Sequence, residues 1–281
     1  MPNISLIADS GSTKTEWCLL INGKTKIFHT LGLSPYFLNK NQIAEVVRSE
    51  VLTKMKGQIP EQIFFYGTGC KSPLNKKLIK TALISVFKNA KVNVFDDLTG
   101  VARSSCGREK GIACILGTGS NSCFYNGNKI VKNSPGLGFI LGDEGSGAVL
   151  GKSLIQHYLY DIFENDLKEK FDKKFNVTPE EILDHVYRKP LPNRYLAAFA
   201  IFLAENRGNY MIENIIADGL NSFFYTHLLR YKDVQKYPIH FTGGIAWGFR
   251  DIILSLCHEY ELKPGNIFKT PMKGLINYHK G

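Results

Sequence analysis

Glycine and hydroxyl residues follow an acidic residue in the first turn of the chain. Residues 9–15 read DSGSTKT, and the apolar residues 4–8 before them predict a strand. Such a turn exposes backbone N–H groups and hydroxyls, which suit phosphate oxygens. The Asp9 carboxylate can hold a magnesium ion, directly or through water. Lys14 could approach the same phosphates, although a lysine in a polar turn is more often merely solvated.

A second turn of the same kind occurs later in the chain. Residues 117–121 read GTGSN, and Gly119 and Ser120 align with Gly11 and Ser12 at an offset of 108. A plain tight hairpin explains one such turn as well as a phosphate site does. Two turns at matching positions favour a phosphate held between two lobes.

Acidic residues form the next candidate group. Asp96 and Asp97 follow the strand-like residues 91–95, and carboxylates at the carboxyl end of a strand point into the cleft of an open α/β sheet. Asp143 lies in the sequence GDEGSG, where glycines allow another molecule to approach the backbone closely. Asp97 and Asp143 could instead be helix N-caps, a common role for aspartate. Either residue taken alone leaves both roles open, but two phosphate-type turns in the same chain favour the functional role.

The elements that must position these residues are predicted to occur twice. Residues 4–28 and 112–131 each read as a strand, a turn, a second strand, an Asn-Gly turn and a third strand. A buried strand, a helix and another short strand follow in each half. The sequence therefore predicts a duplicated α/β fold with mixed sheets.

A helical insert is expected at about 145–232, within the second half. Residues 166–174 are rich in charge and predict an exposed helix, whereas 196–206 and 211–230 have apolar residues at helical spacing. Residues 145–153 resemble a Walker A loop, but Ser146 stands where that loop needs glycine and the stretch looks helical. The glycine-rich fingerprint of dinucleotide-binding proteins is also absent here, because the spacing of Gly136, Gly138 and Gly142 differs from it by one residue. We therefore expect no NAD.

Composition excludes several other classes of protein. The 281 residues are 44% hydrophobic and 21% charged, which is typical of a globular chain. The net charge of +10 comes from scattered basic residues, so we expect no nucleic-acid partner. The longest apolar run, 196–204, is too short to span a membrane. Six cysteines without a CxxC pair, and no signal peptide, predict a cytoplasmic protein with reduced thiols.

These motifs together resemble the sugar kinase/Hsp70/actin superfamily. Closest are the N-acetylglucosamine kinases and the BadF/BadG-type ATPases grouped with them. The motifs are DxGxT from residue 9, DDxxG at 96–100, GTGSN at 117–121, GDEGS at 142–146 and TGG at 242–244. The resemblance implies two ribonuclease-H-like lobes flanking a nucleotide cleft, with ATP and Mg²⁺ as cofactors and an amino sugar as substrate.

The resemblance also implies a division of the chain and a role for each residue. The first lobe would comprise 1–100 plus 272–281, and the second 101–271. Asp97 matches the base that takes the proton from the sugar hydroxyl. The nucleotide would contact Asp9, Gly11, Ser12, Thr13, Lys14, Gly117, Thr118, Gly119, Thr242, Gly243 and Gly244. The sugar would contact Tyr36, Ser120, Asn121, Gly136, Leu137 and Asp143.

The sequence departs from that family at the sugar wall. Tyr36 stands where those kinases typically carry asparagine, and Leu137 and Phe139 make the wall more apolar. An amino sugar with apolar bulk, such as N-acetylmuramic acid, is therefore one candidate substrate. Two other functions stay open: an ATPase that activates a partner enzyme, for which Cys106 is the only near match to a cluster ligand, and a sugar-sensing regulator. A homodimer is compatible with the sequence.

Overall fold

The computed structural model describes residues 4–11, 13–134 and 136–280. The chain folds into two compact units. Unit 1 comprises residues 1–109, 126–130 and 270–281, and unit 2 comprises 110–125 and 131–269. The division expected at residues 100 and 101 lies inside the helix Asp97–Cys106, whose residues all belong to unit 1.

Unit 1 contains a mixed five-stranded sheet. Its strands are β1 (Ile4–Ser10), β2 (Lys14–Ile21), β3 (Lys24–Leu31), β4 (Gln62–Gly67) and β5 (Lys91–Asp96), in the order β3-β2-β1-β4-β5. β1 runs antiparallel to β2 and parallel to β4, and β4 runs parallel to β5. The parallel register places Ser10 beside Gly67 and Gly67 beside Asp96, so the acidic ends of β1 and β5 flank β4.

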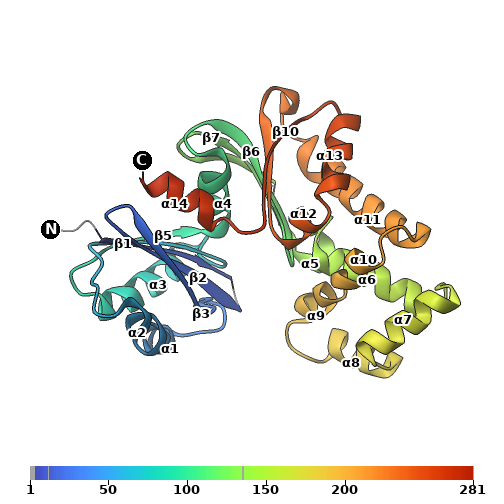
Figure 1. Cartoon of the computed structure of the whole chain (residues 1–281), viewed down its shortest axis with the longest axis horizontal. Coiled ribbons are helices and arrows are strands. Elements are labelled where there is room, and N and C mark those ends of the chain that lie inside the picture. Colours follow the sequence, from blue (N-terminus) through green and yellow to red (C-terminus); the bar gives the residue numbers. More distant parts are fainter. Residues whose placement is uncertain (1–3, 12, 135, 281) are drawn as a thin grey trace. The chain divides into compact units, whose positions relative to one another are not determined.

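Helices cover both faces of this sheet. Successive side chains of β1 point to opposite faces, and its apolar residues are buried on both. Leu6 and Ala8 face a core shared with α1 (Lys40–Val46), the π-helical segment η1 (Val47–Leu52), α2 (Thr53–Met55) and α3 (Pro73–Val86). Ile7 faces a second cluster, which includes Met272 and Leu275. There α14 (Met272–Lys280) packs on β1, β2 and α4 (Asp97–Cys106) (Figure 1).

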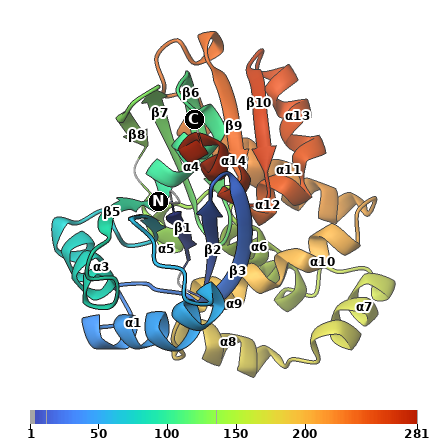
Figure 2. The ribbon, with the colours of Figure 1, turned by 60° about the vertical axis from the view of Figure 1, so that its left-hand side comes forward.

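Unit 2 repeats the same sheet. Its strands are β6 (Lys110–Leu116), β7 (Ser120–Asn126), β8 (Ile130–Ser134), β9 (Pro238–Thr242) and β10 (Lys263–Phe268). Their order in the sheet is β8-β7-β6-β9-β10. The third, second, first, fourth and fifth strands of the unit are thus neighbours in that order, as in unit 1. The predicted duplication and the α/β class with mixed sheets are therefore confirmed. After β9 come α12 (Gly244–Gly248) and α13 (Arg250–Glu259), and α13 packs beside β10 (Figure 2).

The helical insert lies between β8 and β9. Its elements are α5 (Gly138–Leu141), α6 (Gly147–Leu159), α7 (Asn165–Phe175), α8 (Pro179–Tyr187), α9 (Pro192–Ala198), α10 (Ala200–Glu205), α11 (Tyr210–Phe223), the π-helical segment η2 (Phe224–Leu228) and the 3-10 turn η3 (Val234–Lys236). Apart from α5, which has no buried residue, these elements pack their apolar sides into one core with β6 and β9.

The expectation that residues 166–174 form an exposed helix was wrong for one side of α7. Leu167 and Phe171 are buried, and Phe171 packs against Phe163, Phe199 and Phe202. The charged residues between them cover the outer side only. Among the described residues, no helix is both long and apolar enough to cross a membrane.

Candidate functional site

The first glycine turn of unit 1 joins β1 to β2. The Gly11 N–H donates to the Lys14 carbonyl at 3.0 Å, and the Thr13 carbonyl accepts from the Gly32 N–H at 2.9 Å. Gly11, Thr13 and Lys14 are exposed, so the Thr13 hydroxyl and the Lys14 ammonium are accessible to a ligand. Ser12, predicted to belong to the same phosphate loop, lies outside the described residues.

Two carboxylates stand near this turn at the ends of β1 and β5. Burial, together with the nearby carboxylates of Asp97 and Glu16, raises the pKa of Asp9 to about 7. Burial also raises the pKa of Asp97, while hydrogen bonds from the Thr68 hydroxyl and the Leu98 N–H lower it. The two aspartates therefore repel each other in a partly desolvated site, an arrangement that favours a cation or a proton between them.

Asp96, rather than Asp97, is the N-cap of α4. The Asp96 carboxylate accepts from the Thr99 N–H and the Thr99 hydroxyl, both at 2.9 Å. Asp97 is the first residue of the helix, and its carboxylate accepts from the Thr68 hydroxyl and the Leu98 N–H, also at 2.9 Å. The alternative that Asp97 is an N-cap is therefore wrong.

Tyr36 also belongs to unit 1. Its ring is 67% exposed and lies against Gly69, where an added Cβ would sit 2.8 Å from the ring. Gly69 follows Thr68, the residue that holds Asp97. The structure thus places Tyr36, a predicted sugar contact, beside the loop that contains Thr68 and Gly69, next to the candidate base. The other predicted sugar contacts lie at residues 120–143.

The second glycine turn, in unit 2, joins β6 to β7. The Gly117 N–H donates to the Gly119 carbonyl at 3.0 Å. The carbonyls of Gly117 and Thr118 accept from the first N–H groups of α6, those of Gly147 and Ala148, at 2.8 and 3.1 Å. These bonds fix the turn against the start of α6, which is a true helix and no Walker A loop.

The TGG segment at the end of β9 lies against this turn. Gly243 has a φ of +134°, and a Cβ there would sit 2.1 Å from the Leu116 carbonyl oxygen, so only glycine fits. Thr242 is buried, and its hydroxyl has no hydrogen-bond partner within the described ranges. Gly244 is exposed. The structure therefore brings the two predicted nucleotide segments of unit 2 together.

A cavity of about 700 Å³ opens beside these two segments. The predicted residues Gly117, Thr118 and Gly244 lie in its wall. Its other walls come from α9, α10, α12 and the residue after β10, and they include Ala197, Ala198, Ala200, Ile201, Ala204, Ile245, Trp247, Gly248, Phe249 and Lys269. A mostly apolar cavity that ends at a glycine turn suits a flat heterocycle joined to phosphates.

The predicted sugar residues of unit 2 form one cluster. The Asp143 carboxylate accepts from the Ser120 N–H, and a Cβ on Gly119 would lie 2.8 Å from it. Gly136 packs against Ser120 and Asn121, with 3.4 Å from a built Cβ to the Ser120 carbonyl oxygen. The Asn121 side-chain oxygen accepts from Asn133 at 2.9 Å, which fixes the orientation of the amide.

Asp143 is not an N-cap either. Ser146 caps α6, since its hydroxyl accepts from the Val149 N–H. Asp143 instead has a φ of +57°, an uncommon conformation for aspartate that is frequent at functional sites. Burial raises its pKa, while the Ser120 N–H and the nearby His227 lower it.

Three residues of the site were not foreseen from the sequence. They are Thr68, which donates to Asp97, Asn133, which donates to Asn121, and His227, which contacts Glu144 at 3.0 Å. Thr68 and His227 act through partners 29 and 83 residues away, whereas Asn133 acts across the β7–β8 hairpin. Only the Thr68 position carried a signal, because it lies in a glycine turn at the end of a buried strand.

The duplicated mixed sheets, each with a glycine turn after its first strand, define a protein of the sugar kinase/Hsp70/actin superfamily. The glucokinase of Streptomyces griseus, a ROK family protein solved with glucose and AMPPNP, shares this fold: it is 14% identical, with a TM-score of 0.59 over 99% of this chain and 100% of that one. A proposed N-acetylglucosamine kinase of Porphyromonas gingivalis is 40% identical, with a TM-score of 0.93 over 98% of both chains. The chain belongs to the N-acetylglucosamine kinase-like family of ATP-dependent sugar kinases.

A curated sequence agrees with this assignment. The N-acetyl-D-glucosamine kinase of Dictyostelium discoideum is 25% identical over 267 residues, which cover 84% of this chain and 83% of that protein. No protein-family model matches the chain.

Proposed function

We propose that the chain transfers the γ-phosphoryl group of ATP to a hydroxyl of an amino sugar related to N-acetylglucosamine, with Asp97 as the general base. One observation carries the role of the base: Asp96 caps α4, which leaves the Asp97 carboxylate half-buried and held by Thr68. The names of the relatives support the sugar class.

ATP would bind through the glycine turns. The cavity of unit 2 has the size and the apolar walls for adenosine, and Gly117, Thr118 and Gly244 lie where it meets the phosphate-binding backbone. Gly119, Thr242 and Gly243 would shape this turn. From unit 1, the exposed Thr13 hydroxyl and Lys14 ammonium would supply donors, and Gly11 would let the phosphates approach the backbone closely.

The donor set fits magnesium held mainly by nucleotide phosphates. The described residues contain no cluster of three metal-ligating side chains, and Mg²⁺ in kinases commonly takes only one or two carboxylates plus phosphate oxygens. Asp9 would supply that carboxylate, directly or through water. A bound Mg²⁺ would neutralise phosphate charge, and it would also relieve the repulsion that raises the pKa of Asp9.

The residues of unit 1 would move one proton. Phosphoryl transfer depends mostly on positioning and charge neutralisation. Asp97 would accept the proton of the attacking sugar hydroxyl as the new oxygen–phosphorus bond forms, and ADP would leave with the bonding electron pair. The Thr68 hydroxyl, which donates to one carboxylate oxygen, would keep Asp97 oriented and ionised.

The sugar would lie against the cluster of unit 2. Asp143, Asn121 and the backbone at Ser120 and Gly136 offer polar groups for hydroxyls and an acetamide. Leu137 is 58% exposed at the start of α5, so an apolar group stands next to these polar ones. This supports an amino sugar that carries an apolar substituent, such as N-acetylmuramic acid.

Substitution of the base tests this proposal. Asp97→Asn should lower kcat by at least about 10²-fold and leave the KM values for ATP and sugar within a few-fold. Asp96→Asn is the matched control, because asparagine caps a helix as well as aspartate does, and it should keep near-parental kcat. Unchanged turnover in Asp97→Asn, measured by a coupled ADP assay over a panel of amino sugars, would contradict the assignment.

A further inference from the structure

Unit 2 contains a histidine–carboxylate pair that the proposed reaction does not use. His227 Nε2 lies 3.0 Å from Glu144 Oε2, and the two side chains are 3% and 24% exposed. An ionised carboxylate only accepts hydrogen bonds, so Nε2 carries the proton and donates it. The pair joins positions 83 residues apart in the sequence.

A local irregularity of the helix places this histidine. α11 continues into the π-helical segment η2, which contains His227. Such π-helical turns are rare and occur frequently at functional sites. The His227 ring stacks on Phe223, with ring centroids 4.7 Å apart, so the imidazole has one fixed orientation.

The loop that carries Glu144 is fixed at a second point on the same helix. Gly145 has a φ of +70°, and a Cβ there would lie 2.8 Å from Phe223 Cβ. Glu144 itself reaches towards the sugar cluster, since a Cβ on Gly142 would lie 3.6 Å from its Oε2 and 3.0 Å from Leu137 Cβ. His227 and Phe223 thus hold both sides of the loop just after Asp143.

We infer that His227 is a positioning residue for sugar binding: through its hydrogen bond to Glu144 it holds the 142–145 loop so that Asp143 and Leu137 face the sugar. This rests on the proposed function. The left-handed backbone of Asp143 needs such external support, because aspartate adopts it at a cost.

The test compares two variants at His227 by steady-state kinetics. His227→Phe keeps a ring against Phe223 but removes the donor, so the KM for the sugar should rise about tenfold or more, while the KM for ATP stays within twofold. In His227→Gln the side-chain amide reaches about as far as Nε2, so it should restore the sugar KM to within about threefold of the parent. His157→Phe, which alters a half-buried histidine elsewhere in unit 2, should change neither KM.

A double-mutant cycle shows whether the effect of His227 is transmitted through Glu144 or arises from packing alone. If His227 acts through Glu144, then His227→Phe combined with Glu144→Ala should be no worse than either change alone. Additive losses, a folded His227→Phe with a parental sugar KM, or a His227→Gln as impaired as His227→Phe would each overturn the inference. If His227→Phe does not fold, His227→Asn replaces it, since its shorter amide cannot reach Glu144.

The result also distinguishes this inference from the function on which it rests. A parent chain that phosphorylates a sugar, together with His227 variants of parental sugar KM, overturns only the role of His227. A parent chain that turns over none of the amino sugars overturns the proposed function and this inference with it.

Discussion

The role proposed for Asp97 depends on which of two adjacent aspartates caps α4. Asp96 is the residue before α4 and has the extended backbone of an N-cap, so its carboxylate turns back onto Thr99. Asp97 is the first residue of the helix, and its carboxylate accepts hydrogen bonds from the Thr68 hydroxyl and the Leu98 N–H. One position along the chain thus separates a structural carboxylate from a candidate catalytic one.

Removal of the Thr68 hydroxyl should impair catalysis more than binding. Thr68→Val keeps the shape of the side chain, and the loss of one hydrogen bond to a charged group predicts a fall in kcat of about tenfold or more. Because that bond lowers the pKa of Asp97, the acid limb of the kcat/KM profile should move to higher pH. The measurement is a pH–rate series, with Thr68→Ser restoring activity.

Thr99→Val is the control for Thr68. Its hydroxyl donates to Asp96, the capping carboxylate, with the same 2.9 Å geometry. It should lower the free energy of unfolding slightly and leave kcat near the parental value. Equal effects of both changes on kcat would mean that Thr68 only supports the helix.

The sugar wall gives a second prediction at this scale. An apolar wall discriminates between substrates by only about 1–3 kcal/mol, whereas a hydrogen-bonding site discriminates much more strongly. With Leu137 exposed beside Asp143, we expect tolerance among related sugars or a preference for one with an apolar substituent. The measurement is kcat/KM for N-acetylglucosamine, N-acetylmuramic acid, glucose and glucosamine. A preference for N-acetylglucosamine above about 10³-fold would show that this interpretation of the wall is wrong.

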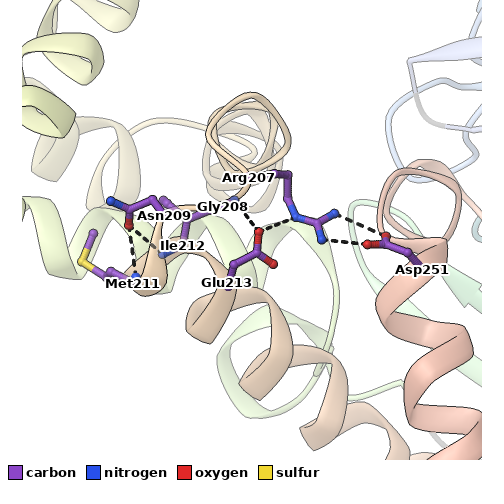
Figure 3. Close-up of polar contacts among 7 residues, drawn as sticks. All are labelled: Arg207, Gly208, Asn209, Met211, Ile212, Glu213 and Asp251. Atoms are coloured by element: carbon purple, nitrogen blue, oxygen red, sulfur yellow. Dashed lines mark hydrogen bonds and ion pairs between the residues drawn. The ribbon is translucent and has the colours of Figure 1, made fainter.

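At the scale of elements, one arginine joins the turn before α11 to the start of α13. Arg207 donates to Glu213 at 2.8 Å and to both carboxylate oxygens of Asp251 at 2.7 and 3.3 Å (Figure 3). Glu213 also accepts from the Gly208 N–H, and Asn209 caps α11 in the same turn. This network holds the start of α13. The residue directly before α13 is Phe249, which lines the cavity.

Loss of this arginine should destabilise the chain modestly. Arg207→Gln removes a two-pronged ion pair that is partly exposed, so the free energy of unfolding should fall by about 1 kcal/mol. The arginine lowers the pKa values of Asp251 and Glu213, so this stability is present above their unfolded values and is lost as the pH falls through the folded ones.

Chemical denaturation at two pH values measures this effect. Parent and Arg207→Gln should differ at pH 7 and converge below about pH 4, where the carboxylates become protonated. Arg188→Gln, which removes an exposed pair with 4.0 Å separation, should cost little at either pH. A difference that persists at low pH would show that Arg207 acts by packing instead.

At the scale of the whole molecule, the buried carboxylate of Asp9 links function to global stability. The pKa of Asp9, raised to about 7, exceeds its value in an unfolded chain, near 3.9. An acid of this kind stabilises the fold fully below its unfolded pKa, and this stability is lost as the pH rises through about 7. The ionised carboxylate of Asp9 therefore lowers the stability of the fold at neutral and alkaline pH.

Asp9→Asn should remove that cost. The melting temperature at pH 8 should rise by several degrees relative to the parent, since about 1 kcal/mol corresponds to ~2–4 °C for chains of this size, and the gap should narrow at pH 5. Activity should fall in the same variant. Asp166→Asn, at an exposed position of α7, should show no such trend. A parental melting curve at pH 8 would contradict the origin assigned to the raised pKa.

The sequence alone determined the duplicated α/β fold, because strand alternation, glycine turns and helical spacing are local signals that recur along the chain. It also indicated the glycine turns, Asp97 and Asp143, because acids at strand ends and between glycines carry a chemical signature. It could not decide which acids cap helices, because a cap depends on where the helix begins to within one residue. Asp96 and Ser146 hold those positions.

Only the tertiary structure decided the partners and the buried side of α7. Thr68 meets Asp97 across two strands, and His227 meets Glu144 because a π-helical turn shifts the register of the helix. The charge of residues 166–174 predicted an exposed helix, yet Phe171 is buried in an aromatic cluster that other helices supply. Such contacts depend on packing between distant segments, for which a single sequence holds no local signal.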